Sequence, residues 1–83
     1  MSAEEFARLK HDIESRQTEV DRAFARLEDF AGKHPDATEA SSKPSLQDVR
    51  EMYALLEHLM ETMSRLNASY KVYVKMLEER IGF

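Results

Sequence analysis

The feature that most constrains this chain is a long apolar repeat in its second half, from Leu46 to Ile81. Steps of alternately three and four residues land on apolar side chains over about four heptads. The positions are Val49, Met52, Leu56, Leu59, Met63, Leu66, Tyr70, Tyr73 and Leu77. Residues at this spacing lie on one side of an α-helix, so the repeat predicts one long helix with an apolar face.

A second file of apolar residues widens that face. It recurs every seven residues beside the first file, at Leu46, Tyr53, Met60, Val74 and Ile81, and Asn67 interrupts it. A face of this width exceeds what one neighbouring helix covers in a two-helix seam. We therefore expect the helix over about residues 46–81 to contact more than one partner.

The first half predicts another amphipathic helix, over about residues 3–31. Its a and d positions are Phe6, Leu9, Ile13, Val20, Ala23, Leu27 and Phe30, with Phe24 alongside. Ser2 and Glu5 have the spacing of a capping box, which indicates where this helix begins. Arg16 falls on a d position, and two interpretations stay open. Its stem packs while its guanidinium reaches water or pairs with Asp12 or Glu19, or else it sets the register against a carboxylate of a partner helix.

Residues 32–45 lack any apolar period and are predicted to form a loop, with a short turn of helix around 36–40 as an option. Gly32 is a natural left-handed residue after a helix, and Pro35 cannot continue one. Ser45, followed by Asp48, is predicted to cap the second helix, and Gly82 to end it.

These elements predict an all-α fold: a two-helix antiparallel hairpin with a longer C-terminal helix, forming one domain over residues 1–83. The two helices are about 40 and 54 Å long at 1.5 Å per residue, and Phe6 should lie near residues 70–74. The second helix would then overhang the first by about two turns. The overhang would carry Val74, Met76, Leu77, Ile81 and Phe83. With 83 residues and no cysteine, the chain is expected to need oligomerisation or a partner to complete its core.

Composition argues against several function classes. The net charge of −4 argues against a nucleic-acid ligand, and neither half has the one-sided basic face of a membrane-surface helix. No apolar run is long enough to span a membrane, and residues 1–10 do not resemble a Sec signal.

His58 and Glu61 share a helix face without a third ligand, so we interpret them as solvated surface residues. We expect no enzyme activity, cofactor or metal, because no constellation fits a catalytic site.

Three segments resemble the axial subunits of type III secretion systems, the needle and inner-rod proteins. Residues 17–27 are similar to the first helix of needle subunits, and Lys43-Pro44-Ser45 to their turn. Asn67-Ala-Ser followed by residues 70–75 resembles their stretch before the C-terminus. The resemblance implies a helical hairpin that polymerises through its C-terminal helix. It also implies bacterial cytoplasm before assembly and a secreted or envelope-associated location afterwards; the residues themselves leave the compartment unknown.

We therefore expect a non-enzymatic structural subunit that assembles with itself. The alternative is a small adaptor or chaperone hairpin that masks an amphipathic helix of a partner protein. In both cases the predicted interface is Val49, Met52, Leu56, Leu59, Met63, Leu66, Tyr70, Tyr73, Val74, Leu77, Ile81 and Phe83. Asn67, Lys71 and Lys75, off the main stripe, would face solvent or a lumen.

Overall fold

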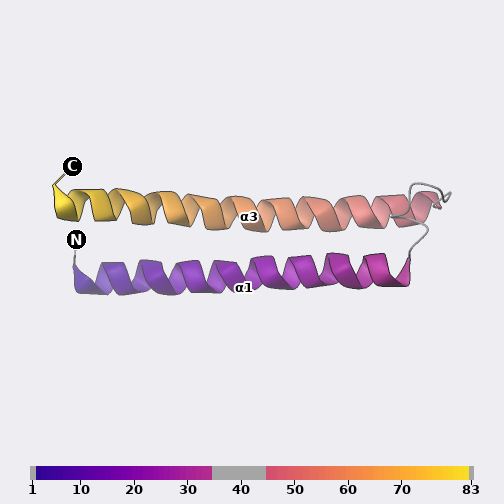
Figure 1. Ribbon diagram of the computed structural model, residues 1–83, viewed down its shortest axis with the longest axis horizontal. Coiled ribbons are helices and arrows are strands. Elements are labelled where there is room, and N and C mark those ends of the chain that lie inside the picture. Colours follow the sequence, from indigo (N-terminus) through magenta and orange to yellow (C-terminus); the bar gives the residue numbers. More distant parts are fainter. Residues whose placement is uncertain (1, 35–44, 83) are drawn as a thin grey trace.

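The computed structural model of the chain is a hairpin of two long helices (Figure 1). It describes residues 2–34 and 45–82. Helix α1 runs over Ala3–Lys33 and helix α3 over Leu46–Ile81. The helices lie side by side and antiparallel over their whole lengths, in a rod with extents of 56 × 21 × 15 Å. The prediction of an all-α hairpin with a longer second helix is confirmed.

Serine caps and a glycine set three of the four helix ends. The Oγ atoms of Ser2 and Ser45 accept hydrogen bonds of 3.1 Å from the backbone N–H groups of Glu5 and Asp48. Each bond satisfies one of the amides that a first helical turn leaves free. Gly82 ends α3 in the left-handed conformation, at φ 82°, which L side chains rarely adopt. The predicted caps Ser2, Ser45 and Gly82 are thus confirmed.

The end of α1 differs from the prediction. Gly32 does not terminate the helix, which continues to Lys33, and His34 occupies the cap with its N–H bonded to the Phe30 carbonyl at 2.9 Å. Side-chain contacts, and not a left-handed glycine, stabilise this last turn of α1. The His34 ring stacks on Phe30 with centroids 4.6 Å apart, and its Nδ1 lies 3.6 Å from Asp48 Oδ1 on α3. The optional helical turn around 36–40 lies outside the described residues.

The apolar repeat of α1 faces α3 as predicted. Ile13, Ala23 and Phe30 are buried. Their neighbours in the repeat are half-buried: Phe6, Leu9, Val20 and Leu27. These side chains form the α1 half of a thin core that extends along the whole hairpin.

The predicted overhang of α3 is wrong. Phe6 does reach the expected level, with its ring 5.6 Å from that of Tyr73. However, the start of α1 extends further, because Ser2 and Ala3 line a hollow with Phe6 and Arg80 in the last turn of α3. Figure 1 shows the two helices ending close to the same level where the termini lie. Val74, Leu77 and Ile81 near the end of α3 are exposed because they point away from α1 and not because α3 extends past it.

Candidate interaction surface

Helix α3 presents two apolar stripes, and α1 covers only one of them. We call the covered one the inner stripe; its members are buried or half-buried, and alternate at steps of three and four residues. They are Met52, Leu55, Leu59, Thr62, Leu66, Ser69, Tyr73 and Met76. This spacing is that of a coiled-coil seam, so α1 and α3 pack along one continuous line.

The second stripe, here the outer stripe, is exposed along its whole length. It has eleven positions at the same alternating steps: Leu46, Val49, Tyr53, Leu56, Met60, Met63, Asn67, Tyr70, Val74, Leu77 and Ile81. Its ten apolar side chains retain 37–70% of their full exposure. From Tyr53 to Leu77, each outer position follows an inner position by one residue, so the two stripes lie about 100° apart around the helix.

The interface predicted from sequence is therefore divided between two surfaces. Met52, Leu59, Leu66 and Tyr73 belong to the inner stripe and pack against α1 of the same chain. Their contact with a neighbouring chain stays a prediction. Seven predicted residues belong to the exposed outer stripe: Val49, Leu56, Met63, Tyr70, Val74, Leu77 and Ile81. Phe83 lies outside the described residues.

Four members of the inner stripe lie outside the interface predicted from sequence: Leu55, Thr62, Ser69 and Met76. Thr62 is 1% exposed and Ser69 is also buried, so the two most buried side chains of α3 are polar. A search for apolar residues alone passes over them. Small residues at these positions let the two helices approach closely, and their alternation with Leu59 and Leu66 was the available signal.

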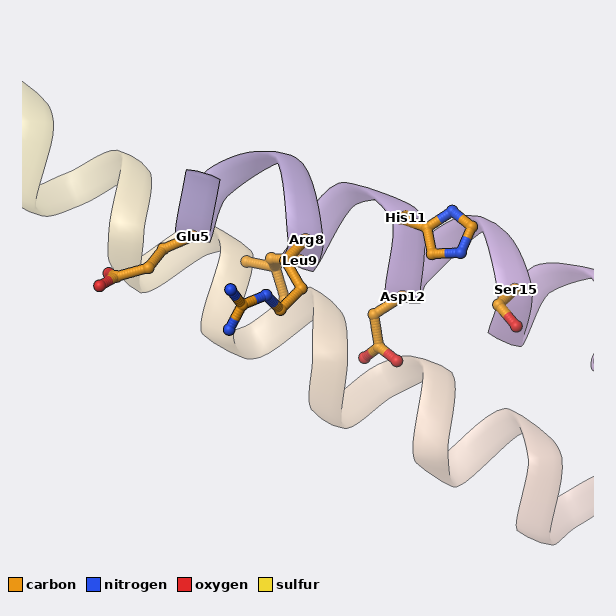
Figure 2. A pocket seen from close by; sticks show the side chains of 6 residues that line it. All are labelled: Glu5, Arg8, Leu9, His11, Asp12 and Ser15. Carbon is orange, nitrogen blue, oxygen red and sulfur yellow. The ribbon is translucent and has the colours of Figure 1, made fainter. Parts of the chain in front are cut away.

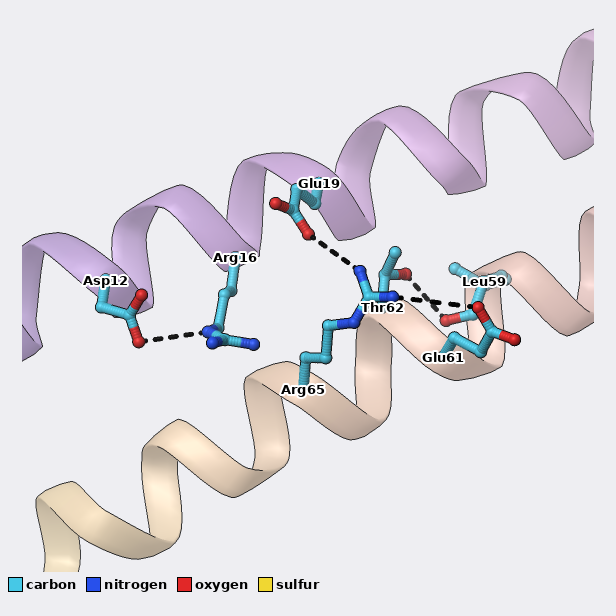
Figure 3. A network of polar contacts seen from close by, with 7 residues as sticks. All are labelled: Asp12, Arg16, Glu19, Leu59, Glu61, Thr62 and Arg65. Carbon is cyan, nitrogen blue, oxygen red and sulfur yellow. Dashed lines mark hydrogen bonds and ion pairs between the residues drawn. The ribbon is translucent and has the colours of Figure 1, made fainter.

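The buried hydroxyls are satisfied by hydrogen bonds. Thr62 Oγ1 donates to the Leu59 carbonyl at 2.8 Å, within its own helix (Figure 3). Ser69 Oγ donates to Asp12 Oδ2 on α1 at 3.1 Å. Among the described residues, every buried side-chain nitrogen and oxygen has a hydrogen-bond partner. The polar residues of the inner stripe therefore add specificity without the cost of an unpaired group.

Arg16 follows the first of its two interpretations. Its Nε donates to Asp12 Oδ2 at 3.1 Å, within α1, while the side chain is half-buried (Figure 3). Asp12 thus links the Arg16 guanidinium to the Ser69 hydroxyl of α3. This junction fixes the register of the two helices without needing a partner chain.

Arg65 forms ion pairs with both helices at the edge of the hairpin that lies away from the outer stripe. One of its Nη atoms lies 3.8 Å from Glu19 on α1, and the other lies 3.9 Å from Glu61 on α3 (Figure 3). All three side chains are about half exposed. Ion pairs this exposed contribute about 0–1 kcal/mol each, so the edge is polar and weakly held.

The opposite edge joins α1 to the outer stripe. Gln17 Nε2 donates a hydrogen bond to the Tyr70 hydroxyl, which places this edge of α1 beside a member of the stripe. Phe24, seven residues further along α1, is half exposed. The outer stripe is therefore bordered by α1 on one side, and Phe24 adds an exposed aromatic ring on the same face of α1 as Gln17.

The hollows of the molecule are surface depressions. One hollow, of about 410 Å³, is lined by Glu5, Arg8, Leu9, His11, Asp12 and Ser15 (Figure 2). All six come from α1, so one helix surface forms the lining. A substrate pocket needs groups that converge from several elements on an enclosed volume, and this arrangement does not supply them.

Neither a metal cluster nor a membrane span is found in the described part of the chain. No three histidine, aspartate or glutamate side chains within residues 2–34 and 45–82 are grouped so as to hold a metal ion. Neither α1 nor α3 is apolar enough over a sufficient length to cross a membrane. The outer stripe is thus the most distinctive surface that the described residues offer.

Comparison with known proteins gives no family. No protein-family model, curated protein or solved structure matches the chain.

Proposed function

We propose that the chain is a non-enzymatic structural subunit that assembles by packing the outer stripe of α3 against helices of other chains. One observation carries this proposal: ten apolar side chains at heptad spacing stay 37–70% exposed along α3. Monomeric proteins rarely leave an apolar surface of this extent in water. At about 25 cal/mol per Å² of apolar surface removed from water, covering the stripe is strongly favourable.

The small core of the hairpin supports the same proposal. Only three apolar side chains are buried among the described residues: Ile13, Ala23 and Phe30. A chain of this size buries too little surface for a large stability, and many such domains gain the rest by association. Packing a second helix on the outer stripe would convert half-exposed side chains into core.

A more specific form of the proposal is an axial subunit like those of type III needles or inner rods. The resemblance of residues 17–27, 43–45 and 67–75 to those subunits supports this form. In such a polymer α3 would contact neighbouring copies, with exposed Lys71 and Lys75 turned toward a lumen or solvent. Open-ended growth requires two unlike contact surfaces that repeat head to tail.

The second candidate is an adaptor or chaperone that masks an amphipathic helix of another protein. The composition of the outer stripe favours it, because Met60, Met63, Tyr53 and Tyr70 are all exposed. Methionine adapts to several packings, and tyrosine combines a large apolar ring with a polar tip. An adaptor would bind its partner at a fixed stoichiometry instead of growing.

Sedimentation velocity over a wide concentration range tests the proposal. Growth into large open-ended species would support the axial form, and a discrete oligomer would support a closed assembly. A chain that stays monomeric and helical at high concentration would contradict self-assembly. It would direct attention to the adaptor function.

Two valines give a matched test of the surface. Val74 in the outer stripe is 51% exposed, and Val72, two residues earlier and outside both stripes, is 48% exposed. We expect Val74→Asp to abolish assembly, as we expect for Leu77→Asp and Ile81→Asp, while helicity measured by circular dichroism remains. Val72→Asp should assemble like the parent chain. Equal effects of Val72→Asp and Val74→Asp would reject the stripe as the interface.

A further inference from the structure

We infer that the occupant of the outer stripe is the outer stripe of a second copy, packed antiparallel about a two-fold axis near Ser64. This inference rests on the proposed self-assembly in its closed form, a discrete oligomer and not an axial polymer, and it adds the partner and its orientation. It follows from the stripe, from the charges along one of its edges and from the polar residues at its centre.

The two-fold pairing follows first from the lack of another matching surface among residues 2–34 and 45–82. Among the exposed large apolar residues of the described chain, Phe24 is the one that α1 contributes. Helix α1 therefore has no second apolar stripe that could cover α3 of another copy. The outer stripe is long and apolar, and the surface of this chain that matches it is the same stripe, as in a self-complementary two-fold interface.

An antiparallel register aligns the whole stripe. In the outer stripe, Leu46, Tyr53, Met60, Asn67, Val74 and Ile81 are a positions, and Val49, Leu56, Met63, Tyr70 and Leu77 are d positions. If residue i of one copy lies level with residue 130 − i of the other, each a position lies opposite a d position of the partner copy. Val49 then lies level with Ile81, Leu56 with Val74, and Met60 with Tyr70. The paired region covers residues 49–81 of both copies and is about 50 Å long. At a width of about 10 Å per helix, the two copies together bury about 1,000 Å², near the lower end for specific dimers.

The charges beside the stripe fit this orientation. The free edge of the stripe, away from α1, carries Arg50, Glu57, Ser64, Lys71 and Glu78 at seven-residue spacing, all exposed. In the antiparallel register, the axial offset between Arg50 and the partner copy's Glu78 is about 3 Å. The axial offset between Glu57 and the partner copy's Lys71 is also about 3 Å. The two-fold axis doubles both pairs. Four pairs of opposite charge would therefore flank the seam, with no like-charged pair at that edge.

A parallel pair would lose this complementarity. In that orientation the free edge of one copy lies against the other edge of its partner's stripe. That other edge consists of Met52, Leu59, Leu66 and Tyr73, which are half-buried against α1 and carry no charge. The charged residues of the free edge would then have no charged counterparts there. The charge pattern thus favours the antiparallel pair.

The polar residues of the stripe lie where the antiparallel pair brings them together. Asn67 is the one non-apolar member of the outer stripe, and Ser64 is the uncharged member of the free edge. Both lie within two residues of the two-fold axis, on the same edge. In the pair, Asn67 and Ser64 of each copy would meet their counterparts in one polar cluster. A polar layer inside an apolar seam fixes register, because any shift would bury the amide against apolar side chains.

Distances between spin labels test the orientation directly. The chain has no cysteine, so Ala54→Cys and Ala68→Cys each provide a single labelling site. These exposed alanines are two heptads apart and occupy the same position on the helix. In the antiparallel pair the two Ala54 sites are offset by about 33 Å along the axis and the two Ala68 sites by about 9 Å. A parallel pair has no axial offset at either site.

We therefore expect the nitroxide separation from pulsed electron resonance to be at least about 15 Å longer for the Ala54→Cys variant. Equal separations in the two variants would overturn the inference, while the proposed self-assembly would stand. Monomers in sedimentation, with no dipolar coupling at either site, would reject the inference and the self-assembly together. The two failures are thus distinguishable.

A charge exchange gives an independent test. Glu57→Lys or Lys71→Glu alone places like charges opposite one another at two symmetry-related points of the pair. Either variant should raise the dissociation constant about tenfold. The double variant restores opposite charges and should return to within about threefold of the parent. Glu79→Lys makes the same change in charge on the face of α3 opposite the outer stripe. It should leave the dissociation constant within about twofold of the parent value. A double variant no tighter than the single ones would overturn the antiparallel pairing.

Discussion

The hydroxyl of Ser69 on α3 donates a 3.1 Å hydrogen bond to Asp12 on α1, and the same carboxylate oxygen accepts from Arg16. Ser69 is buried, so its hydroxyl depends on this bond. We expect Ser69→Ala to lower the free energy of unfolding by about 1 kcal/mol. Urea denaturation followed by circular dichroism, at one fixed protein concentration, would measure the loss.

Asp12→Ala should cost more than Ser69→Ala, about 1–3 kcal/mol, because it leaves the buried Ser69 hydroxyl unsatisfied and Arg16 without its carboxylate. Ser15→Ala is the control: Ser15 is exposed on the same helix as Asp12, lies outside both stripes, and alanine has the better helix propensity. Equal stabilities of the Ser69→Ala and Ser15→Ala variants would show that the junction contributes nothing to the fold.

The close approach of the helices predicts different outcomes at two small residues. Ala23 is 2% exposed, and it lines a hollow between the helices together with the buried Thr62. Ala23→Leu inserts a larger side chain where the helices are near one another, and should destabilise the hairpin by about 1–3 kcal/mol. Thr62→Val keeps the shape and removes a hydroxyl that bonds only within its own helix. It should change the unfolding free energy by less than about 1 kcal/mol.

Thermal unfolding of the two variants, at matched concentration, separates these effects. The Ala23→Leu variant should melt below the parent chain, and the Thr62→Val variant close to it. If Ala23→Leu were tolerated without loss, the helices would have to lie further apart at this level than the burial of both residues indicates.

The cap of α3 gives a local prediction. Ser45 Oγ accepts from the Asp48 N–H at 3.1 Å, at the point where the described chain enters the helix. Ser45→Ala should destabilise the hairpin by about 1 kcal/mol, because the amide loses its acceptor. Ser45→Asp should retain most of the stability, since a carboxylate also accepts the bond and suits the positive end of the helix dipole. Hydrogen exchange at the first turn of α3 would detect the change.

The sequence predicted the helices, their caps at Ser2, Ser45 and Gly82, and the face of α1 from local patterns alone. These features depend on spacing within one helix, which the chain order specifies directly. The end of α1 was predicted less well. Gly32 has the right residue type for a left-handed turn, but the stacking of His34 on Phe30 and the proximity of Asp48 depend on α3 being there.

The division of α3 into two stripes could not be deduced from apolar periodicity. A wide apolar face allows several lines of contact, and which one α1 takes depends on side-chain size across the seam. The small side chains of Thr62 and Ser69 fit the line that α1 takes, since they allow close packing and the Ser69 hydroxyl bonds to Asp12. The predicted overhang is wrong for a related reason: helix length alone predicts that Val74, Leu77 and Ile81 extend past α1, whereas they are exposed because they point away from it.

The aromatic contact at the open end of the hairpin gives the last prediction. Phe6 lies with its ring centroid 5.6 Å from that of Tyr73, and the Arg80 guanidinium lies 5.4 Å from the centre of the Phe6 ring. Phe6→Ala removes both contacts and should lower the unfolding free energy by about 1–3 kcal/mol, less than for a fully buried phenylalanine, because Phe6 is half-buried. Hydrogen exchange should show faster opening of residues 3–10 and 73–81, with little change near Phe30. Phe6→Leu keeps the apolar bulk but removes the ring, so it should recover only part of the loss. Full recovery by leucine would mean that apolar burial, and not the aromatic and cation–π geometry, holds the two helix ends together.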